Sequence, residues 1–284
     1  MSFHSLQLAT SAGHTITVKT FQPDQPKAVV IVAGAVGVPQ YHYEKFARWL
    51  SQLGYAAITF DYDGIGESVD GHVKNSRSDM MSWGRNDASA VLDHAAGQYP
   101  NLKINWVGHS VGGQLLGFLS NAHLIDKVVT VASGSGYWWH NSAPTKRIVW
   151  LLWFLIVPVI VPLAGYFPGR TLNMVGDLPK PMMQQWRRWC LNHRYALGVE
   201  GDAVVEEFEQ RTFPMTGIWF SDDEMMSAKS IESLHGFYPN APKQMICVKP
   251  EDAGHKRIGH LGWFKDRYQS GIWEQFILPE LVSN

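Results

Sequence analysis

Segments that favour β-strands alternate with segments that favour helices along most of the chain. Six short apolar runs, several of them apolar on both faces, occupy residues 28–33, 55–60, 104–107, 128–132, 215–220 and 245–248. Such strands are typical of a parallel sheet with both faces covered. Helical patterns lie at residues 43–53, 79–96, 113–122, 230–237 and 263–281. With two antiparallel strands expected between residues 6 and 20, the alternation predicts a mostly parallel, eight-stranded α/β sheet flanked by helices.

The alternation breaks once, between residues 136 and 210. This stretch has no clear strand signal and is rich in tryptophan, with prolines at positions 144, 158, 162, 168, 179 and 181. It is too long for a structureless loop inside a compact domain. We therefore predict a helical cap, or lid, at residues 136–210, inserted between two parts of the core at residues 1–135 and 211–284.

The amino-acid composition indicates which classes of binding partner are expected. Apolar residues make up 45% of the 284 positions and charged residues 17%, which predicts a globular chain. The formal net charge is −1 with no long run of one sign, so the basic surface of a nucleic-acid-binding protein is not expected. A small-molecule substrate, apolar or lipid-like, fits better, and the oligomeric state stays open.

The two cysteines and the amino terminus bear on cofactors and location. Cys190 and Cys247 lie in no Cys-x-x-Cys or Cys/His cluster, so no zinc site or redox pair is predicted. We expect neither a metal nor an organic cofactor. Residues 1–18 lack a basic segment followed by an apolar core, so no secretory signal is expected. These features favour a reducing cytoplasm and leave membrane association open.

Residues 148–167 form an apolar segment without charge that follows Lys146 and Arg147. About 20 such residues are long enough to span a bilayer. Against a span, Pro158 and Pro162 each remove a helix hydrogen-bond donor, and in lipid the freed carbonyls would need other partners. We favour a buried or substrate-facing cap helix over an interfacial helix in peripheral contact with a membrane, and both over a span.

A candidate nucleophile follows the strand at residues 104–107. Gly108-His-Ser-Val-Gly112 is a Gly-x-Ser-x-Gly motif that stands before a helical pattern. A nucleophile on so sharp a turn has a strained backbone, and its neighbours two residues away must be small. The turn lifts the Ser110 hydroxyl above the carboxyl edge of the sheet and points the Val111 N–H at a developing oxyanion. The flanking strand and helix favour a nucleophile turn over a chance glycine-rich loop.

The base is sought beyond the serine, because the acid and then the histidine follow it in folds with this motif. Only His255 and His260 lie after the last expected strand. His260 stands directly before a helical pattern, whereas His255 lies among charged residues typical of a solvated loop. We predict His260 as the base and His255 as a surface or substrate-side group. His235, on a helix face, is predicted to be structural.

The acid is expected on the loop after the strand at residues 215–220. Asp222, Asp223 and Glu224 stand there in a row. The acid must hold the imidazole in the right tautomer and stabilise the imidazolium. We choose Asp223, because Glu224 then continues into the next helix. Asp222 is the alternative, and a solvated acidic loop with a helix cap is the simpler interpretation.

The second oxyanion donor is expected in the loop after the strand at residues 28–33. Small residues there, Ala33-Gly-Ala-Val-Gly37, let the backbone approach a substrate closely. The sequence does not separate the N–H of Ala35 from that of Val36 as the donor.

These motifs resemble a known superfamily. Gly108-His-Ser-Val-Gly-Gly113, Phe60-Asp-Tyr-Asp-Gly-Ile-Gly-Glu-Ser68 and Gly259-His-Leu-Gly-Trp-Phe264 are similar to the α/β-hydrolases, nearest to a bacterial group of predicted hydrolases close to the serine-aminopeptidase and monoglyceride-lipase-like branch. The resemblance covers nearly the whole chain and implies a triad of Ser110, Asp223 and His260. It departs at two points: Ala-Gly or Ala-Val replaces the common His-Gly of the oxyanion loop, and Asp63 stands where many relatives have arginine.

The predicted function is hydrolysis of a carboxylic ester, or a related acyl bond, through an acyl-enzyme on Ser110. An aromatic roof over an apolar substrate is predicted from Trp138, Trp139, Trp150 and Trp153; the alternative is that they only pack the cap onto the sheet. An acyltransferase with the same triad and a non-catalytic binding protein on this fold are the alternative functions. Serine at position 110 argues against a dehalogenase or epoxide hydrolase, which would normally have aspartate there.

Overall fold

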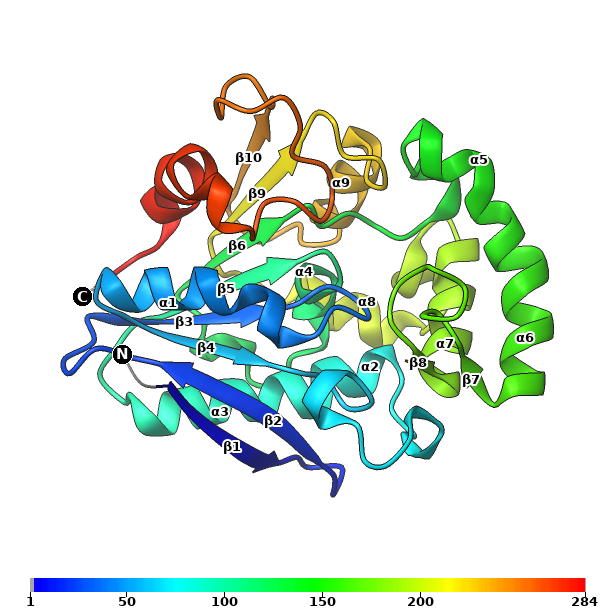
Figure 1. The fold of residues 1–284 in the computed structure, drawn as a ribbon, viewed down its shortest axis with the longest axis horizontal. Helices are drawn as coiled ribbons and strands as arrows, with labels where there is room; N and C mark the ends of the chain where they lie inside the picture. The colour runs from blue at the N-terminus through cyan, green and yellow to red at the C-terminus, as the bar shows by residue number, and fades with distance from the viewer. Residues whose placement is uncertain (1–2, 284) are drawn as a thin grey trace.

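Helices cover both faces of an eight-stranded sheet in the computed structural model, which describes residues 3–283 (Figure 1). In their order across the sheet the strands are β1 (Phe3–Ala9), β2 (Thr15–Phe21), β4 (Tyr55–Phe60), β3 (Ala28–Ala33), β5 (Ile104–His109), β6 (Lys127–Val131), β9 (Met215–Phe220) and β10 (Lys243–Val248). The β1–β2 and β2–β4 pairs are antiparallel and the other pairs are parallel. The predicted mostly parallel, eight-stranded α/β sheet is confirmed.

The central strands are buried on both faces. In β3, Val29 and Ile31 belong to one hydrophobic cluster, whereas Val30 and Val32 belong to a second. Successive side chains of a strand point to opposite faces, so two separate cores hold the sheet between helices. Burial of each such side chain is worth about 1.5–3 kcal/mol. The parallel strands are thereby fixed with their carboxyl ends along one edge, where the loops with the candidate residues begin.

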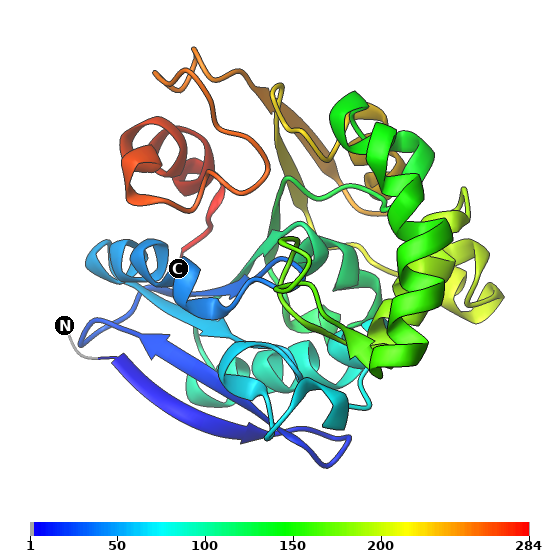
Figure 2. The same ribbon diagram turned by 45° about the vertical axis from the view of Figure 1, so that its right-hand side comes forward.

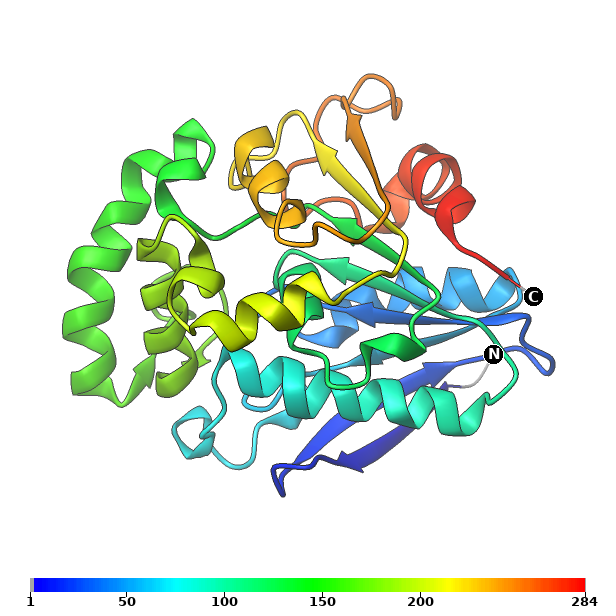
Figure 3. The same ribbon diagram turned by 180° about the vertical axis from the view of Figure 1, so that it is seen from behind.

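The flanking helices include α1 (Glu44–Gln52), α3 (Ser89–Gln98) and α9 (Ala228–His235). α1 packs against the π-helical segment η11 (Gln269–Ile277) on one face, where the ring centroids of Phe46 and Trp273 are 5.1 Å apart. α3 covers the opposite face, as the view from behind shows (Figure 3). It continues directly from α2 (Met80–Ser82) and the π-helical η4 (Trp83–Ala88), so the helix predicted at residues 79–96 is present.

Two predicted helices are shorter in the structure. Residues 113–122 were expected to form one helix, but only α4 (Val111–Gln114) and the 3-10 turn η5 (Leu115–Phe118) are found. Gly117 lies in this segment, and glycine weakens helices. A residue with a side chain does not fit there, because a Cβ at Gly117 would lie 2.1 Å from the ring of Phe208. The C-terminal helical segment η11 likewise begins later than residue 263, because the residues after Gly259 form the turns that carry His260.

The chain between β6 and β9 is mainly helical and lies to one side of the sheet (Figures 1 and 2). Its helices are α5 (Ala143–Leu151), the π-helical η8 (Leu152–Ile156), α6 (Val157–Ala164), α7 (Lys180–Leu191) and α8 (Asp202–Glu209). α5, η8 and α6 run without a break from Ala143 to Ala164. The antiparallel pair of β7 (Tyr166–Phe167) with β8 (Leu178–Pro179) is a feature that the sequence does not predict, because two-residue strands have no periodicity.

Pro158 and Pro162 lie within this helical stretch without ending it. In the π-helical register the carbonyl of Trp153 would accept from residue 158, and proline has no N–H to offer. Arg187, on α7, supplies the missing donor, since its Nε lies 2.6 Å from that oxygen. The freed carbonyl of Trp153 therefore has its partner inside the protein. This contact anchors the helix to α7 of the cap.

Candidate active site

Ser110 occupies the sharp turn between β5 and α4. Its backbone has a φ of 52° and a ψ of −113°, a combination that is costly for a residue with a side chain. Glycine is required on both sides of it. A Cβ at Gly108 would lie 2.5 Å from the oxygen of Gly112, and a Cβ at Gly112 would lie 2.2 Å from the oxygen of Ala33. The glycines of the motif thus have a steric cause.

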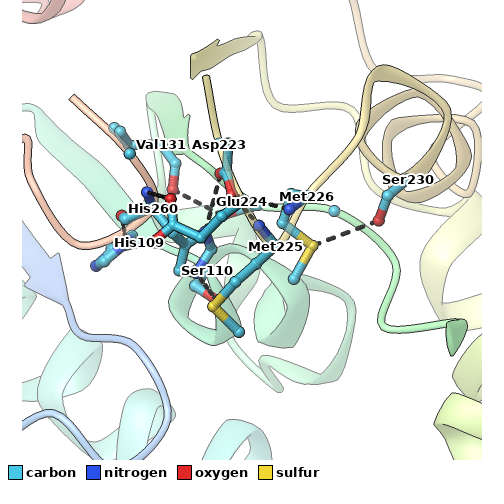
Figure 4. Close-up of polar contacts among 12 residues, drawn as sticks. His109, Ser110, Val131, Asp223, Glu224, Met225, Met226, Ser230 and His260 are labelled. Atoms are coloured by element: carbon cyan, nitrogen blue, oxygen red, sulfur yellow. Dashed lines mark hydrogen bonds and ion pairs between the residues drawn. The ribbon is translucent and has the colours of Figure 1, made fainter. Parts of the chain in front are cut away.

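His260 lies between Ser110 and Asp223 (Figure 4). The distance from His260 Nδ1 to Asp223 Oδ2 is 2.9 Å, and from His260 Nε2 to Ser110 Oγ it is 3.1 Å. Because a carboxylate only accepts, Nδ1 carries the proton and donates to Asp223. Nε2 is then free to accept from the Ser110 hydroxyl. In this order of donors the imidazole can take the serine proton.

The carboxylate of Asp223 is oriented by the backbone of its own loop. Oδ1 accepts the N–H groups of Met225 and Met226 at 2.7 and 2.8 Å, which leaves Oδ2 to the imidazole. Ser110, Asp223 and His260 are only 4%, 5% and 2% exposed. Their contacts therefore operate away from water, where a hydrogen bond is electrostatically stronger.

The two neighbouring acids hold the loop that carries the histidine. Asp222 Oδ2 accepts the N–H of Ile258 at 2.8 Å, and Glu224 Oε2 accepts the N–H of His260 at 3.1 Å. Both carboxylates are thus directed at the backbone of this loop. Of the two alternatives left by the sequence, the structure places Asp223 against the imidazole and gives Asp222 a supporting contact that the sequence does not indicate.

The loops that could supply oxyanion donors lie on two sides of the serine. Val111 begins α4, so its N–H is one of the first-turn groups without a partner inside the helix. In the loop after β3, the N–H of Ala35 donates to the Tyr43 hydroxyl at 2.9 Å. Ala35 is therefore engaged within the protein. Val36 is the alternative whose N–H has no acceptor among residues 3–283.

Buried hydrogen bonds join the loop after β3, the candidate oxyanion loop, to His260. His109 Nε2 lies 3.0 Å from the carbonyl oxygen of His260, which can only accept, so Nε2 carries the proton. Nδ1 of His109 then accepts from the Tyr43 hydroxyl at 2.7 Å, and the Tyr43 oxygen accepts from Ala35. Burial, and secondarily the nearby His260, lower the pKa of His109 well below its usual value. A neutral ring with one donor and one acceptor fits this arrangement.

Sequence reasoning did not single out Tyr43 or His109. A search for the base beyond Ser110 passes over His109, although this residue stands inside the Gly-x-Ser-x-Gly motif. Tyr43 begins a helical pattern in which an aromatic residue is expected to pack in the core. Their contact joins positions 66 residues apart, and no local pattern reports it.

Known proteins share this architecture. A family model described as serine aminopeptidase, S33, matches residues 24–163. A soluble variant of monoglyceride lipase from Saccharomyces cerevisiae is similar in structure, with a TM-score of 0.65 and 13% identity over 88% of this chain and 86% of that one. A carboxyl esterase from Bacillus coagulans has a TM-score of 0.61 and 13% identity over 88% and 90%. A putative lipase from Acinetobacter baumannii has a TM-score of 0.58 and 16% identity over 94% and 87%.

The chain has the α/β-hydrolase fold. The family model matches just under half of the chain and, together with these structures, supports the predicted superfamily. At these identities the solved structures establish the fold, and together with the matched family model they support a hydrolase. A search of curated proteins found no match to the sequence.

The cap is attached to two loops that carry candidate site residues. At the start of α5, Thr145 Oγ1 donates to the carbonyl of Glu224 at 2.6 Å, next to Asp223. Farther along the cap, the N–H of Gly176 donates to the carbonyl of Gly37 in the oxyanion loop at 3.3 Å. The cap is thus attached on the acid side and on the oxyanion side, which accounts for the burial of the site.

A cavity of about 300 Å³ lies between this cap and the core. Its walls are almost entirely apolar and include Trp153 and Trp186 of the cap. Met225 and Met226, which follow the acidic residues after β9, also line it. The cavity therefore reaches the loop that carries Asp223. Among residues 3–283, no group of three or more His, Cys, Asp or Glu side chains could hold a metal ion.

The structure corrects the predicted aromatic roof. Trp139 and Trp150 are 53% and 50% exposed on the outside of the cap. Trp138 packs against the ring of Trp139 instead of lining the cavity. Of the four predicted residues only Trp153 lines it, and Trp186, which the sequence did not single out, meets Trp153 edge-on at 5.1 Å. Sequence cannot show which side of an all-apolar helix faces inward, because packing decides its rotation.

Asp63, the second point at which the sequence departs from the family that it resembles, has a structural role. Its Oδ2 accepts the hydroxyl groups of Ser76 and Ser78 at 2.6 and 2.7 Å, and the side chain is buried. The contact ties the loop after β4 to the segment before α2. An arginine has no acceptor to offer these two hydroxyl groups.

Proposed function

We propose that this protein is a serine hydrolase that cleaves a carboxylic ester, or a related acyl bond, of a small apolar substrate. The observation that carries the proposal is the continuous contact from Ser110 through His260 to Asp223 on a strained strand-to-helix turn. Strain of this kind persists only where the surrounding structure enforces it, and it is frequent at catalytic sites.

The first half-reaction forms an acyl-enzyme. Ser110 Oγ attacks the acyl carbon while His260 Nε2 takes the hydroxyl proton, and Asp223 stabilises the imidazolium. The N–H groups of Val111 and Val36 donate to the oxyanion that develops on the carbonyl oxygen. When the bond to the alcohol breaks, the leaving oxygen takes the proton from His260.

Water completes the reaction in the second half. His260 takes one proton from the water molecule as its oxygen attacks the acyl carbon, and the same proton returns to Ser110 as the acid leaves. One ester and one water thus become one acid and one alcohol. The same residues serve in both halves, which is why a single histidine suffices.

The cavity supports an apolar acyl group as substrate. A hydrocarbon chain in its walls would gain about 0.8 kcal/mol for each buried methylene. Ser110 is buried beneath the cap, so entry of a substrate requires the cap or its loops to move. Closure behind the substrate would then exclude bulk water from the acyl-enzyme site.

The test is labelling with a fluorophosphonate, mass spectrometry of the labelled peptide, and hydrolysis rates for p-nitrophenyl esters of increasing chain length. We expect the adduct on Ser110, and Ser110→Ala should lose it and lower the ester rate by at least about 10³-fold. Ser120→Ala is the matched control, because this serine is exposed and lies outside the turn.

Equal ester rates in Ser110→Ala and the parent, or an adduct on another residue, would refute the proposal. A folded protein that takes no label would favour a non-catalytic binding protein on this fold. Product analysis with added alcohols separates the acyltransferase alternative, since transfer would then exceed hydrolysis.

A further inference from the structure

The helical stretch Ala143–Ala164 has an apolar side that faces away from the rest of the molecule. Seven of the fifteen exposed large apolar side chains among residues 3–283 lie on it. Within this range it is the one helix long and apolar enough to cross a membrane. Only 28% of its most apolar stretch of 18 residues is buried. A core helix of the same composition would be mostly buried. Packing inside the protein therefore does not account for this composition.

The apolar side chains form two rows along the helix. The inner row, which is 8%, 2%, 2% and 0% exposed, consists of Val149, Trp153, Val157 and Val161. The outer row, which is 67%, 38%, 54%, 46% and 82% exposed, consists of Ile148, Leu151, Leu155, Val159 and Leu163. Spacings of three and four residues keep each row on one side of a helix. Only the inner row is used by the fold, and Figure 2 shows the helix along the outside of the molecule.

Basic and aromatic residues stand at one end of the outer row. Lys146 and Arg147 precede it, and residues 143–164 contain no acidic residue. Lys146 Nζ lies 3.9 Å from the ring centroid of Trp139, which is itself half-exposed. Tryptophan and basic side chains at the edge of an apolar surface are typical of helices in a bilayer interface, where they meet the headgroups. The charge pattern thus favours anionic headgroups as the partner.

The outer surface is continuous with the apolar cavity. Ile148 and Leu151 belong to the outer row and also line the cavity. Met174, which is 46% exposed, lines it as well. The cavity wall is therefore shared with the exposed apolar surface. A molecule with a hydrocarbon chain that enters along these residues would stay in contact with apolar groups from the lipid layer to the cavity.

We propose that the outer row, together with Trp139, Lys146 and Arg147, is a docking surface for a lipid bilayer with anionic headgroups, on which the helix lies flat. A spanning helix would have to withdraw the inner row from its core contacts and release Arg187 from the carbonyl of Trp153. The docking surface is defined without reference to the triad, so it goes beyond the proposed hydrolysis and does not depend on it.

The test is sedimentation of the full-length protein with vesicles of phosphatidylcholine and phosphatidylglycerol in equal parts, compared with phosphatidylcholine alone. Leu155→Glu combined with Leu163→Glu should lower partitioning at least about tenfold, because apolar burial is lost at both positions. Leu53→Glu combined with Met245→Glu is the matched control, with the same change at exposed positions after α1 and on β10. The control should partition like the parent.

The basic residues are tested separately. Arg147→Gln should weaken binding to the anionic vesicles about fivefold, which corresponds to one juxtamembrane charge. It should leave binding to phosphatidylcholine alone unchanged. Equal weakening on both kinds of vesicle would contradict the headgroup contact assigned to this end of the surface.

Two further measurements keep the test independent of folding defects and of catalysis. Brominated phosphatidylcholine should quench the tryptophan fluorescence of the parent, and Trp150→Phe should remove part of that quenching, since Trp150 is half-exposed on this helix. Fluorophosphonate labelling reports on the triad in the same samples. Vesicle binding without labelling would support the docking surface and contradict only the proposed hydrolysis.

Failure of the parent to sediment with either kind of vesicle would overturn the proposal. A parent that is dimeric in analytical ultracentrifugation, becomes monomeric in the double glutamate variant and does not bind vesicles would also overturn it. That result would assign the outer row to an interface between two copies of the chain.

Discussion

The triad region and the cap helix differ in what accounts for their composition. At the candidate site, the ring nitrogens of the buried His260 and His109 are each engaged by an internal partner. In the cap, the stretch Ala143–Ala164 is apolar on both sides although only the inner side is packed. Internal contacts thus explain why these histidines are buried in the core, whereas they explain only the inner side of the cap helix. Surface composition that no internal contact explains points to a partner outside the molecule.

The largest expected effect is on kcat, and it tests Asp223 as the acid of the proposed triad. Asp223→Asn should lower kcat for a p-nitrophenyl ester by about 10⁴-fold, because an amide can hold the imidazole in the wrong tautomer. Asp222→Asn is the control and should cost less than about tenfold, since it only weakens the backbone contacts of Ile258 and Gly259 with this side chain. Steady-state kinetics of the two variants would show which of the two carboxylates acts as the acid. The reverse order of effects would mean that the acid was wrongly assigned.

A second test concerns a buried histidine of the core outside the site. His235 donates from Nδ1 to the carbonyl of Ile231 at 2.7 Å and accepts at Nε2 from the Thr130 hydroxyl at 2.8 Å. Burial lowers the pKa of His235 from 6.5 to about 4. The unfolded chain therefore binds a proton below pH 6.5 that the folded chain refuses until about pH 4. Stability is fully present above that window and falls as the pH falls through it.

The loss should reach about 3 kcal/mol at the acid end of the window, since one pKa unit is worth about 1.4 kcal/mol. Urea denaturation of the parent at several pH values measures it, and His235→Gln should flatten the slope. Equal slopes in the variant and the parent would show that another group is responsible.

A third test addresses the buried contacts between the oxyanion loop and the base. Tyr43→Phe leaves the Ala35 N–H and His109 Nδ1 without their shared partner, which costs about 1–3 kcal/mol. If the hydroxyl positions the oxyanion loop, kcat should fall about tenfold to a hundredfold with KM little changed. Tyr41→Phe, on an exposed ring two positions away, is the control. A change confined to KM would contradict a positioning role.

The smallest expected effect is on the free energy of unfolding. It concerns two valines of the cap helix, which stand two residues apart in different rows. Val161→Ala should lower the free energy of unfolding by about 2 kcal/mol, because Val161 is 0% exposed and leaves a cavity. Val159 is 46% exposed, so Val159→Ala should change it by less than about 0.5 kcal/mol. Denaturant titration of both variants is the measurement. Equal losses would show that the outer row is also packed.

The candidate site could be predicted where its cause is local or follows from chain order. The glycines around Ser110 are demanded by the turn itself, so the motif is visible in the sequence. His260 follows from its place after the last strand, and the acidic residues 222–224 follow from theirs. The choice among those acids depended on which carboxylate contacts the imidazole, and that is a matter of loop conformation.

Other parts of the site could not be predicted because they depend on contacts between distant segments. The pairing of Tyr43 with His109 joins two loops that the sheet brings together. The same Tyr43 hydroxyl engages the N–H of Ala35, which is why we propose Val36 as the oxyanion donor. The cap tryptophans were misplaced because an all-apolar helix carries no pattern that distinguishes its inner side.

By itself, the sequence determined the alternation of strands and helices, the sharp turn at Ser110 and the order in which the candidate acid and base follow it. These features arise from side-chain periodicity and backbone sterics, which act over a few residues. Only the tertiary structure decided the partner of the imidazole, which N–H of the loop after β3 is free, and the outward row of the cap helix. Each of these depends on which groups of distant segments are already engaged with one another, and folding alone establishes that.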